Sequence, residues 1–167
     1  ALKEKRNPYK EMGGLSMEKG ILGTKIVTQI GFVVNDIEKT SQAFADFLGV
    51  EKPQWSLTDT IDKTHGEFNG QPCPARAKLA FFHVGETLDI ELIEPDETPS
   101  VWRNVLNEKG EGVHHIAFVV NGMKEKILAL EGNGMKLLQR GEYTGGRYAY
   151  IDCVDQLKTI VELLEND

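Results

Sequence analysis

The sequence predicts an α+β fold built from two pseudo-symmetric modules, each with the element order β-α-β-β-β. Two internal matches lead to this prediction, because repeated segments indicate a duplicated architecture. The segment 29–35 (QIGFVVN) aligns with 115–121 (HIAFVVN), and the segment 91–94 (ELIE) aligns with 162–165 (ELLE). The first pair is rich in β-branched and aromatic residues, which favour strands. Each half is expected to form a small curved sheet backed by one helix.

Residues 1–23 are predicted to form an N-terminal extension, since they mix charged residues and glycine with little periodicity. Such a segment is expected either to be poorly ordered or to pack on a partner subunit. Residues 24–167 are expected to form one domain, made of the modules 24–96 and 112–165. A linker at 96–100 and a short amphipathic helix after it are expected to connect the two modules.

The first module is expected to contain one helix, which Asn35 and Asp36 can cap at its start and Gly49 can end. Residues 51–78 are less regular and are expected to hold a strand, a loop and a hairpin-like turn. The apolar spacing along the helix covers Ile37, Ala43, Phe44, Phe47 and Leu48. The regular strands of this module are expected at 25–34, 77–84 and 88–93.

The second module is expected to open with a strand that begins at His114 and His115. Because side chains alternate across a strand, these two histidines are expected to face opposite ways, and the internal repeat selects His115. A helix is predicted at 123–130. The remaining strands are expected at 135–139, 147–153 and 157–164, with turns at 142–146 and 155–156.

The composition excludes several classes of partner and site. A net charge of −7 and a pI of about 5.2 argue against nucleic acid and against anionic membranes as partners. The sequence contains no candidate for a membrane-spanning or secretion segment. Only Cys73 and Cys153 occur, so a disulfide framework and a cysteine-based metal site are not expected. A cytoplasmic protein that acts on a small molecule is the expectation.

The repeat singles out four polar residues that occupy matching positions in the two halves. They are Gln29, Glu91, His115 and Glu162. The residue two positions after Gln29 is Gly31, and the residue two positions after His115 is Ala117, so there is room beside each polar group. Each of the four alone is better explained as a core histidine or a solvated strand end. Four ligand-type residues in register favour a site.

These side chains supply one amide oxygen, two carboxylates and one imidazole, without a thiolate. Such a set suits one divalent ion per chain, namely Zn, Ni, Co or Mn. Four protein ligands on an ion that accepts six leave two positions for water or substrate. A carbonyl bound there would be polarised, and the chemistry would then need a nearby base. Glu162 is the first candidate for that base.

The motifs that contain these four residues resemble the vicinal oxygen chelate superfamily over about residues 24–165. They read QIGFVVND from Gln29, ELIEP from Glu91, GVHHIAFVV around His115 and IVEL around Glu162. The superfamily includes glyoxalase I, methylmalonyl-CoA epimerases, extradiol dioxygenases and bleomycin or fosfomycin resistance proteins. The resemblance implies paired βαβββ modules that form a cleft, with metal ligands on the first and last strands of each module. The four residues fall on those ligand positions.

The resemblance leaves lyase and epimerase activity open. The segments ELIEP and KGEGVHHI are similar to those of methylmalonyl-CoA epimerases, but these usually carry His where this chain has Gln29. They also carry a catalytic glutamate on the strand before the second ligand, where residues 75–79 (ARAKL) contain no acid. The ligand set resembles that of zinc-type glyoxalase I, where the last glutamate moves the proton. Its glutathione contacts are not kept, as Val33, Pro95 and Glu111 replace them.

Two further members of the superfamily provide alternatives. Extradiol dioxygenases use two histidines and one glutamate on Fe(II), and Gln29 argues against that set. A non-catalytic ligand-binding or drug-resistance protein normally loses its metal ligands, so four retained ligands favour an enzyme. The expected function is therefore a metal-dependent lyase or isomerase, lactoylglutathione lyase-like or methylmalonyl-CoA epimerase-like. It would move a proton α to a metal-bound carbonyl, and a homodimer is expected because such proteins often form dimers.

Three residues outside the repeat are weaker candidates. Arg147 follows Gly145 and Gly146 and is a candidate for binding an anionic group of the substrate. A loop position would let His65 reach the site, although a loop histidine is more often exposed. Trp102 is expected to pack in the core rather than to contact substrate.

Overall fold

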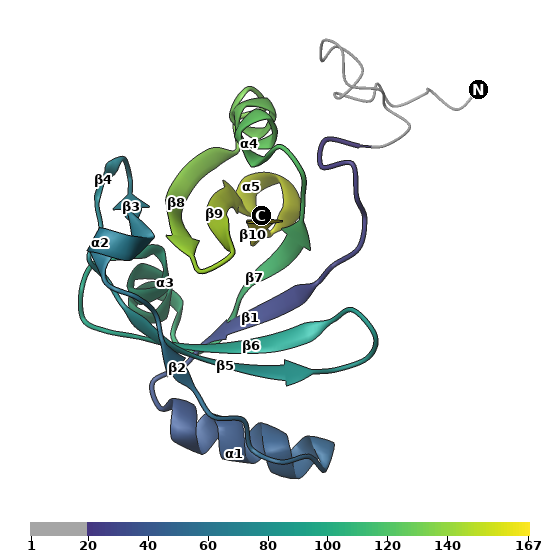
Figure 1. Ribbon diagram of the computed structural model, residues 1–167, viewed down its shortest axis with the longest axis vertical. Helices are drawn as coiled ribbons and strands as arrows, with labels where there is room; N and C mark the ends of the chain where they lie inside the picture. The colour runs from purple at the N-terminus through teal and green to yellow at the C-terminus, as the bar shows by residue number, and fades with distance from the viewer. Residues whose placement is uncertain (1–19) are drawn as a thin grey trace.

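Ten strands of the described residues form one curved mixed sheet, with five helices around it (Figure 1). This computed structural model describes residues 20–167, so most of the extension predicted for residues 1–23 lies outside the described part. The strands are β1 (Gln29–Val33), β2 (Ser56–Leu57), β3 (Glu67–Phe68), β4 (Gln71–Pro72), β5 (Ala77–His83), β6 (Asp89–Pro95), β7 (Gly112–Val119), β8 (Lys136–Tyr143), β9 (Gly146–Cys153) and β10 (Thr159–Asn166). The helices are α1 (Ile37–Leu48), α2 (Ile61–Thr64), α3 (Val101–Lys109), α4 (Met123–Glu131) and α5 (Val154–Leu157).

The two predicted modules lie on either side of the β1–β7 pair, whose strands run antiparallel at the centre of the sheet. From β1 outward the order is β6, β5 and β2, and from β7 outward it is β10, β9 and β8. Each half therefore places its last strand beside its first, in parallel. This repeated order confirms the α+β fold with two βαβββ modules.

The first helix begins and ends where the sequence predicted. The Asp36 side chain accepts a hydrogen bond from Lys39 N at 3.0 Å, and Gly49 ends α1 with a φ of 68°. A left-handed residue at this position suits glycine, which has no Cβ to clash. The predicted apolar face is only partly correct, because the Phe47 side chain is 86% exposed. The predicted Ile37, Phe44 and Leu48 do pack in the core cluster on this side of the sheet, together with Ala45, which was not predicted.

The second glutamate of each repeated ELxE motif holds the start of a helix. Glu94 Oε2 accepts from Ile37 N of α1 at 2.8 Å, and Glu165 Oε1 accepts from Met123 N of α4 at 3.2 Å. The two carboxylates thus satisfy amides that have no partner within their helices, at the positive end of the helix dipole. Each carboxylate is also held by a basic side chain on the neighbouring strand. These ion pairs are Lys78–Glu94 at 2.7 Å and Arg147–Glu165 at 2.8 Å.

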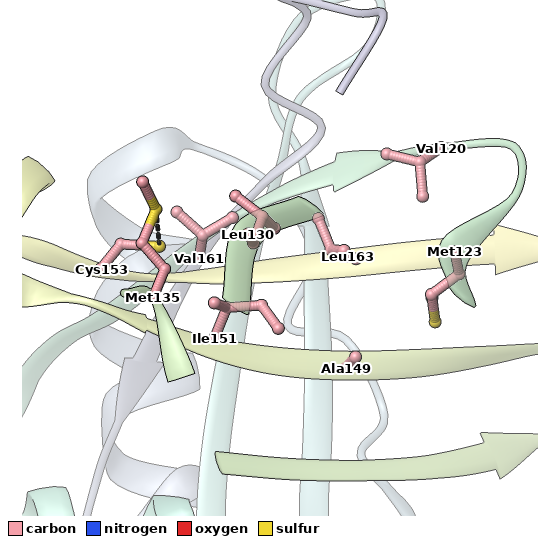
Figure 2. Packing of buried hydrophobic residues seen from close by; sticks show 9 residues of the cluster. All are labelled: Val120, Met123, Leu130, Met135, Ala149, Ile151, Cys153, Val161 and Leu163. Atoms are coloured by element: carbon pink, nitrogen blue, oxygen red, sulfur yellow. Dashed lines mark hydrogen bonds between the residues drawn. The ribbon is translucent and has the colours of Figure 1, made fainter. Parts of the chain in front are cut away.

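The core of the second half lies between α4 and the strands β9 and β10 (Figure 2). Its buried members are Val120, Met123, Leu130, Met135, Ala149, Ile151, Cys153, Val161 and Leu163. Ile21 and Leu22 pack against this cluster, so the last residues of the predicted extension contribute to the core. Cys73 and Cys153 are both free and buried, and the sulfur atoms of Cys153 and Met135 lie 3.5 Å apart.

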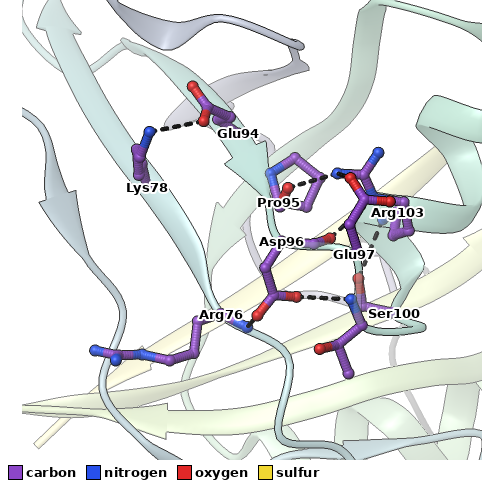
Figure 3. A network of polar contacts seen from close by, with 9 residues as sticks. Arg76, Lys78, Glu94, Pro95, Asp96, Glu97, Ser100 and Arg103 are labelled. Atoms are coloured by element: carbon purple, nitrogen blue, oxygen red, sulfur yellow. Dashed lines mark hydrogen bonds and ion pairs between the residues drawn. The ribbon is translucent and has the colours of Figure 1, made fainter.

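Polar contacts stabilise the predicted linker between the modules (Figure 3). Asp96 Oδ2 accepts from Arg76 N at 3.0 Å, and Arg103 Nε donates to the Asp96 carbonyl at 2.9 Å. Ser100 caps α3, since its hydroxyl accepts from Arg103 N at 3.1 Å. The linker therefore fixes α3 against the end of β6. Among the described residues, none of the helices is long and apolar enough to cross a membrane.

Several strand boundaries differ from the predicted ones, most of all the start of β1 and the end of β8. β1 begins at Gln29, and β10 begins at Thr159 because the helical turn α5 occupies Val154–Leu157. β8 runs to Tyr143 instead of Gln139, because its register with β9 continues up to a tight turn at 144–145. The sequence predicted a turn that begins before the observed one, because the glycine residues in this stretch made the end of the strand difficult to locate.

Candidate metal centre

Two of the four predicted ligands flank Gly31 on the central strand β1. Its register partner on β6 is Glu91, and its partner on β7 is His115. Directly opposed residues on neighbouring strands point to the same face, so both side chains meet over a residue that has none. A Cβ atom on Gly31 would lie 2.1 Å from Cε1 of His115. The imidazole therefore occupies the space that this glycine leaves open.

The other two predicted ligands flank Ala117 on β7. Its partner on β1 is Gln29, and its partner on β10 is Glu162. Ala117 is fully buried and small, so both long side chains pass it on the same face as His115, two positions earlier. Four strands thus bring the four residues to one place at the centre of the sheet.

Unpaired polar atoms gather at this place. Within the described residues, five buried side-chain atoms lack a hydrogen-bond partner, and the fifth, on α1, is Ser41 Oγ. The other four are Gln29 Oε1, Glu91 Oε2, His115 Nε2 and Glu162 Oε2. Because an unsatisfied buried polar atom is costly, four of them on the predicted ligands indicate a group that they would bind together.

Distances between these atoms fit a shared cation. His115 Nε2 lies 3.0 Å from Glu162 Oε2 and 3.4 Å from Glu91 Oε2, without the alignment of a hydrogen bond. One ligand atom from each of these three residues lies within 4.8 Å of the others. The oxygen and nitrogen donors with two carboxylates suit a divalent first-row ion. The donor set therefore fits the predicted metal.

His114 orients the imidazole of His115. The two Nδ1 atoms lie 3.0 Å apart, and His114 Nε2 lies 3.4 Å from the Val101 carbonyl. If His114 Nε2 carries a hydrogen toward that carbonyl, its Nδ1 accepts from His115 Nδ1, and His115 Nε2 is free to bind a cation. Ligating histidines commonly use their second nitrogen in this way.

The expected alternation of the two histidines is wrong. The register between β1 and β7 shifts between Gly31 and Phe32, because β7 has a bulge there: Gly31 faces His115 and Phe32 faces Val113. His114 is the extra residue, and a bulge breaks the alternation of side chains. Both rings therefore lie on the same side, with centroids 5.2 Å apart.

Burial and neighbouring charges shift the pKa values of the ionisable groups at the site. Burial lowers the pKa of His115, but the nearby carboxylates of Glu162 and Glu91 outweigh this and raise it to about 10. Burial raises the pKa of Glu91, against the opposing effect of His115. Burial and the charge of His115 lower the pKa of His114 to about 3, so His114 is neutral and able to accept a hydrogen bond.

A cavity of about 540 Å³ opens onto the site, which is a common size for a small-molecule pocket. Gln29, Glu91 and Glu162 line it, whereas His115 is fully covered. Sequence reasoning missed Tyr148 and Tyr150, which also line it. They lie on β9, and Tyr150 is the register partner of Glu162. Their alternate positions on the predicted strand 147–153 were the available signal.

Two of the three weaker candidates lie away from the cavity. Arg147 does not belong to the cavity lining, and its guanidinium pairs with Glu165 and Asp167. His65 is exposed, and its Nδ1 lies 2.8 Å from Glu142 Oε2. Trp102 is buried in the core as predicted, and it also forms part of the cavity wall.

A sequence profile of the glyoxalase/bleomycin resistance protein/dioxygenase superfamily matches residues 28–150. The chain belongs to this superfamily. Its membership confirms the family that the repeated motifs resemble. The matched segment contains three of the four predicted ligands and ends before Glu162.

One curated relative and several solved structures are similar to this chain. The uncharacterized protein YqjC of Bacillus subtilis (strain 168) is 34% identical over 93 residues, which span 54% of this chain and 66% of YqjC. Hypothetical protein BH1468 from Bacillus halodurans C-125 aligns with a TM-score of 0.58 and 22% identity, over 85% of this chain and 94% of that one.

Methylmalonyl-CoA epimerases share the same fold. The Mycobacterium tuberculosis enzyme aligns with a TM-score of 0.54 and 24% identity, over 90% of this chain and 95% of that one. A methylmalonyl-CoA epimerase in complex with methylmalonyl-CoA and NH4+ aligns with a TM-score of 0.57 and 18% identity, over 84% and 93% of the two chains. At these identities the comparison shows a common fold.

Proposed function

We propose that this protein is a metal-dependent isomerase or lyase that moves a proton α to a carbonyl group. Gln29, Glu91, His115 and Glu162 would hold one divalent ion, which is Zn, Ni, Co or Mn. The observation that supports this best is the set of four buried side-chain atoms on these residues that have no hydrogen-bond partner. A bound ion would supply Lewis-acid polarisation of the substrate carbonyl.

Glu162 is the proposed acid and base. Its Oε2 lies 3.0 Å from His115 Nε2, and its side chain lines the cavity. In this proposal the Glu162 carboxylate leaves the ion as substrate binds, takes the proton from the carbon that bears the hydroxyl group and returns it to the former carbonyl carbon. The hydroxyl proton passes to the former carbonyl oxygen, so that an α-hydroxycarbonyl compound is isomerised without loss or gain of atoms. The tyrosines beside Glu162 and the apolar wall keep bulk water away from this proton.

The residues of β5 in the cavity favour isomerisation, which needs one base, over epimerisation, which needs two. Epimerisation returns the proton to the opposite face of the same carbon and therefore needs a second acid. On β5, the residue opposite Glu91 is Phe81, and the residues of this strand that line the cavity are Leu79 and Phe81. Neither can carry a proton, so the strand before the second ligand offers no base.

Metal content tests the site. Protein purified without chelator should contain about one divalent ion per chain, and a Glu91→Ala, His115→Ala double variant should contain none. A Glu97→Ala, His83→Ala double variant is the matched control, because it removes the same residue types from exposed positions. Protein that takes up none of Zn, Ni, Co and Mn would favour a non-catalytic ligand-binding protein of the same fold.

Proton exchange tests the base. Glu162→Gln should abolish hydrogen–deuterium exchange α to the carbonyl in a panel of α-hydroxycarbonyl compounds, measured by NMR. The amide oxygen of the new side chain can still bind the ion, as proposed for Gln29, so metal content should stay near one per chain. Exchange at the wild-type rate in the metal-loaded variant would rule out Glu162 as the base.

A further inference from the structure

The charged residues of the cavity wall are all acidic. In addition to Glu91 and Glu162, the wall contains Asp59, Asp89 and Glu142. Within residues 20–167, no lysine or arginine belongs to this wall. The basic partners of the three outer acids are Lys63, His83 and His65, which lie outside the lining with side chains 67%, 83% and 67% exposed. Apart from an ion bound by the proposed ligands, an anionic ligand would therefore meet carboxylates and no basic side chain of the described residues.

The polar groups that the wall offers instead are mostly hydroxyls. Tyr148 is the best defined of these, because Gln139 fixes its hydrogen bonding. Gln139 Oε1 accepts from Val101 N at 2.9 Å, so its Nε2 must face Tyr148, whose oxygen accepts at 3.3 Å. The tyrosine hydrogen is then left for another acceptor. Burial raises the pKa of Tyr148 to about 12, so the hydroxyl keeps its proton.

The position of this hydroxyl is fixed by its neighbours. The ring centroids of Trp102 and Tyr150 lie 6.2 and 5.5 Å from that of Tyr148. Gly141 on β8 is its register partner, and a Cβ atom there would lie 2.7 Å from the Tyr148 oxygen. The phenol is therefore packed on several sides, and its hydroxyl is preorganised as a donor.

We propose that the cavity takes an uncharged carbonyl compound and excludes carboxylate and phosphate ligands, with Tyr148 donating a hydrogen bond to a second oxygen of the ligand. The apolar part of the ligand lies against Leu57, Leu79 and Phe81. This inference rests on the proposed function only for the place of the reacting carbonyl. The acidic wall and the tyrosine donor do not depend on a metal.

Tyr143 provides a matched control for Tyr148. It also lines the cavity, but its hydroxyl donates to Asn166 Oδ1 at 3.0 Å. Its hydrogen is therefore already used, and it has none to offer a ligand. Removing this hydroxyl should change ligand affinity far less than removing that of Tyr148.

Two isosteric probes test the inference. 4-Acetylbenzamide is uncharged, and 4-acetylbenzoate has the same shape with one negative charge. Binding is measured by quenching of Trp102 fluorescence in the full chain with Trp55→Phe, since these are the two tryptophans and Trp55 lies outside the lining. Titrations are run on protein as purified, whose metal content is measured on the same sample, and again after chelator treatment.

The amide should bind at least about tenfold more tightly than the acid in both samples, a difference of about 1.4 kcal/mol. Tyr148→Phe should weaken amide binding about three- to tenfold, whereas Tyr143→Phe should change it less than twofold. Equal or tighter binding of the acid, or no binding of either probe at millimolar concentration, would overturn the inference. A preference for the amide in protein without metal would support the inference while the proposed function fails. One metal per chain together with a preference for the acid would support the metal site of the proposed function and overturn this inference.

Discussion

The two halves of the molecule have matching central strands but differ at their edges. In the second half the outer strand β8 has eight residues and pairs along β9. In the first half the equivalent strand β2 has two residues and pairs with β5 only at Ser56 and Leu57. The chain between β2 and β5 instead forms α2 and the β3–β4 hairpin, and β3 pairs with β8 of the other half.

The matching strands and the unmatched edge contribute different parts of the site. The proposed ligands lie on β1, β6, β7 and β10, which match between the halves. The irregular segment of the first half contributes a wall of the cavity, including Leu57, Thr58 and Cys73. An Arg140–Glu67 pair at 2.8 Å helps to attach this segment to β8. The duplicated centre therefore carries the proposed ligands, and the unmatched edge contributes part of the cavity wall.

The centre is also asymmetric in the small residues that the proposed ligands flank. Gly31 in the first half corresponds to Ala117 in the second. Both are buried, but only Gly31 has an imidazole ring over its Cα. The methyl group of Ala117 is tolerated because Gln29 and Glu162 reach past it with longer, flexible side chains.

Gly31→Ala should have the largest effect on the metal centre. The added methyl would lie 2.1 Å from the His115 ring, so the ring must move and its Nε2 with it. We expect a loss of at least about 100-fold in metal affinity, well beyond the 10–100-fold of a lost supporting contact, and a fall of about 1–3 kcal/mol in the free energy of unfolding from overpacking. Isothermal titration with Zn and chemical denaturation measure the two effects.

The reciprocal variant Ala117→Gly is the control. Glycine in a strand costs about 0.5–1 kcal/mol relative to alanine, but the ligands keep their room. Its metal affinity should stay within about threefold of the wild-type value, a free-energy difference under 1 kcal/mol. Equal metal affinities in the two variants would contradict the geometry assigned to His115.

His114→Phe should have the next largest effect, because only the second half has a histidine beside its ligand. The substitution keeps a ring against Tyr150 but removes the Nδ1 that lies 3.0 Å from His115 Nδ1. Loss of such a supporting hydrogen bond typically costs about 10- to 100-fold in metal affinity. His114→Asn should recover part of it, since its side-chain oxygen can accept from His115. An affinity unchanged in both variants would show that His114 has a packing role alone.

The duplication made most of the fold predictable from the sequence. Gln29, Glu91, His115 and Glu162 could be selected because two repeats placed them in register, and the structure brings them together. Helix ends at Asp36 and Gly49 followed from local chemistry that needs no knowledge of the tertiary structure.

Features that depend on the neighbouring strand were not predictable. The bulge at His114 arises from the pairing of β7 with β1, and alternation within one strand gave the wrong face. The exposure of Phe47 depends on which face of α1 packs against the sheet. The crossing of β3 to β8 joins segments about 70 residues apart, and no local pattern encodes it.

Lys78 and Arg147 allow the smallest predicted effect to be compared across the halves. They occupy matching strands, and each pairs with the glutamate that holds the start of a helix. Arg147→Met should lower the free energy of unfolding by under about 1 kcal/mol, as expected for a partly exposed ion pair. Lys78→Met should cost slightly more, because its ammonium also lies 5.0 Å from the centre of the Trp55 ring.

Neither substitution should change the affinity for zinc or for 4-acetylbenzamide by more than about twofold, well under 1 kcal/mol. The role suggested by the sequence for Arg147, contact with an anionic substrate group, predicts a different result. In that case Arg147→Met alone would weaken ligand binding, and Lys78→Met would not. Measuring unfolding and ligand affinity in both variants therefore separates a helix-supporting pair, repeated in the two halves, from a substrate contact found in one.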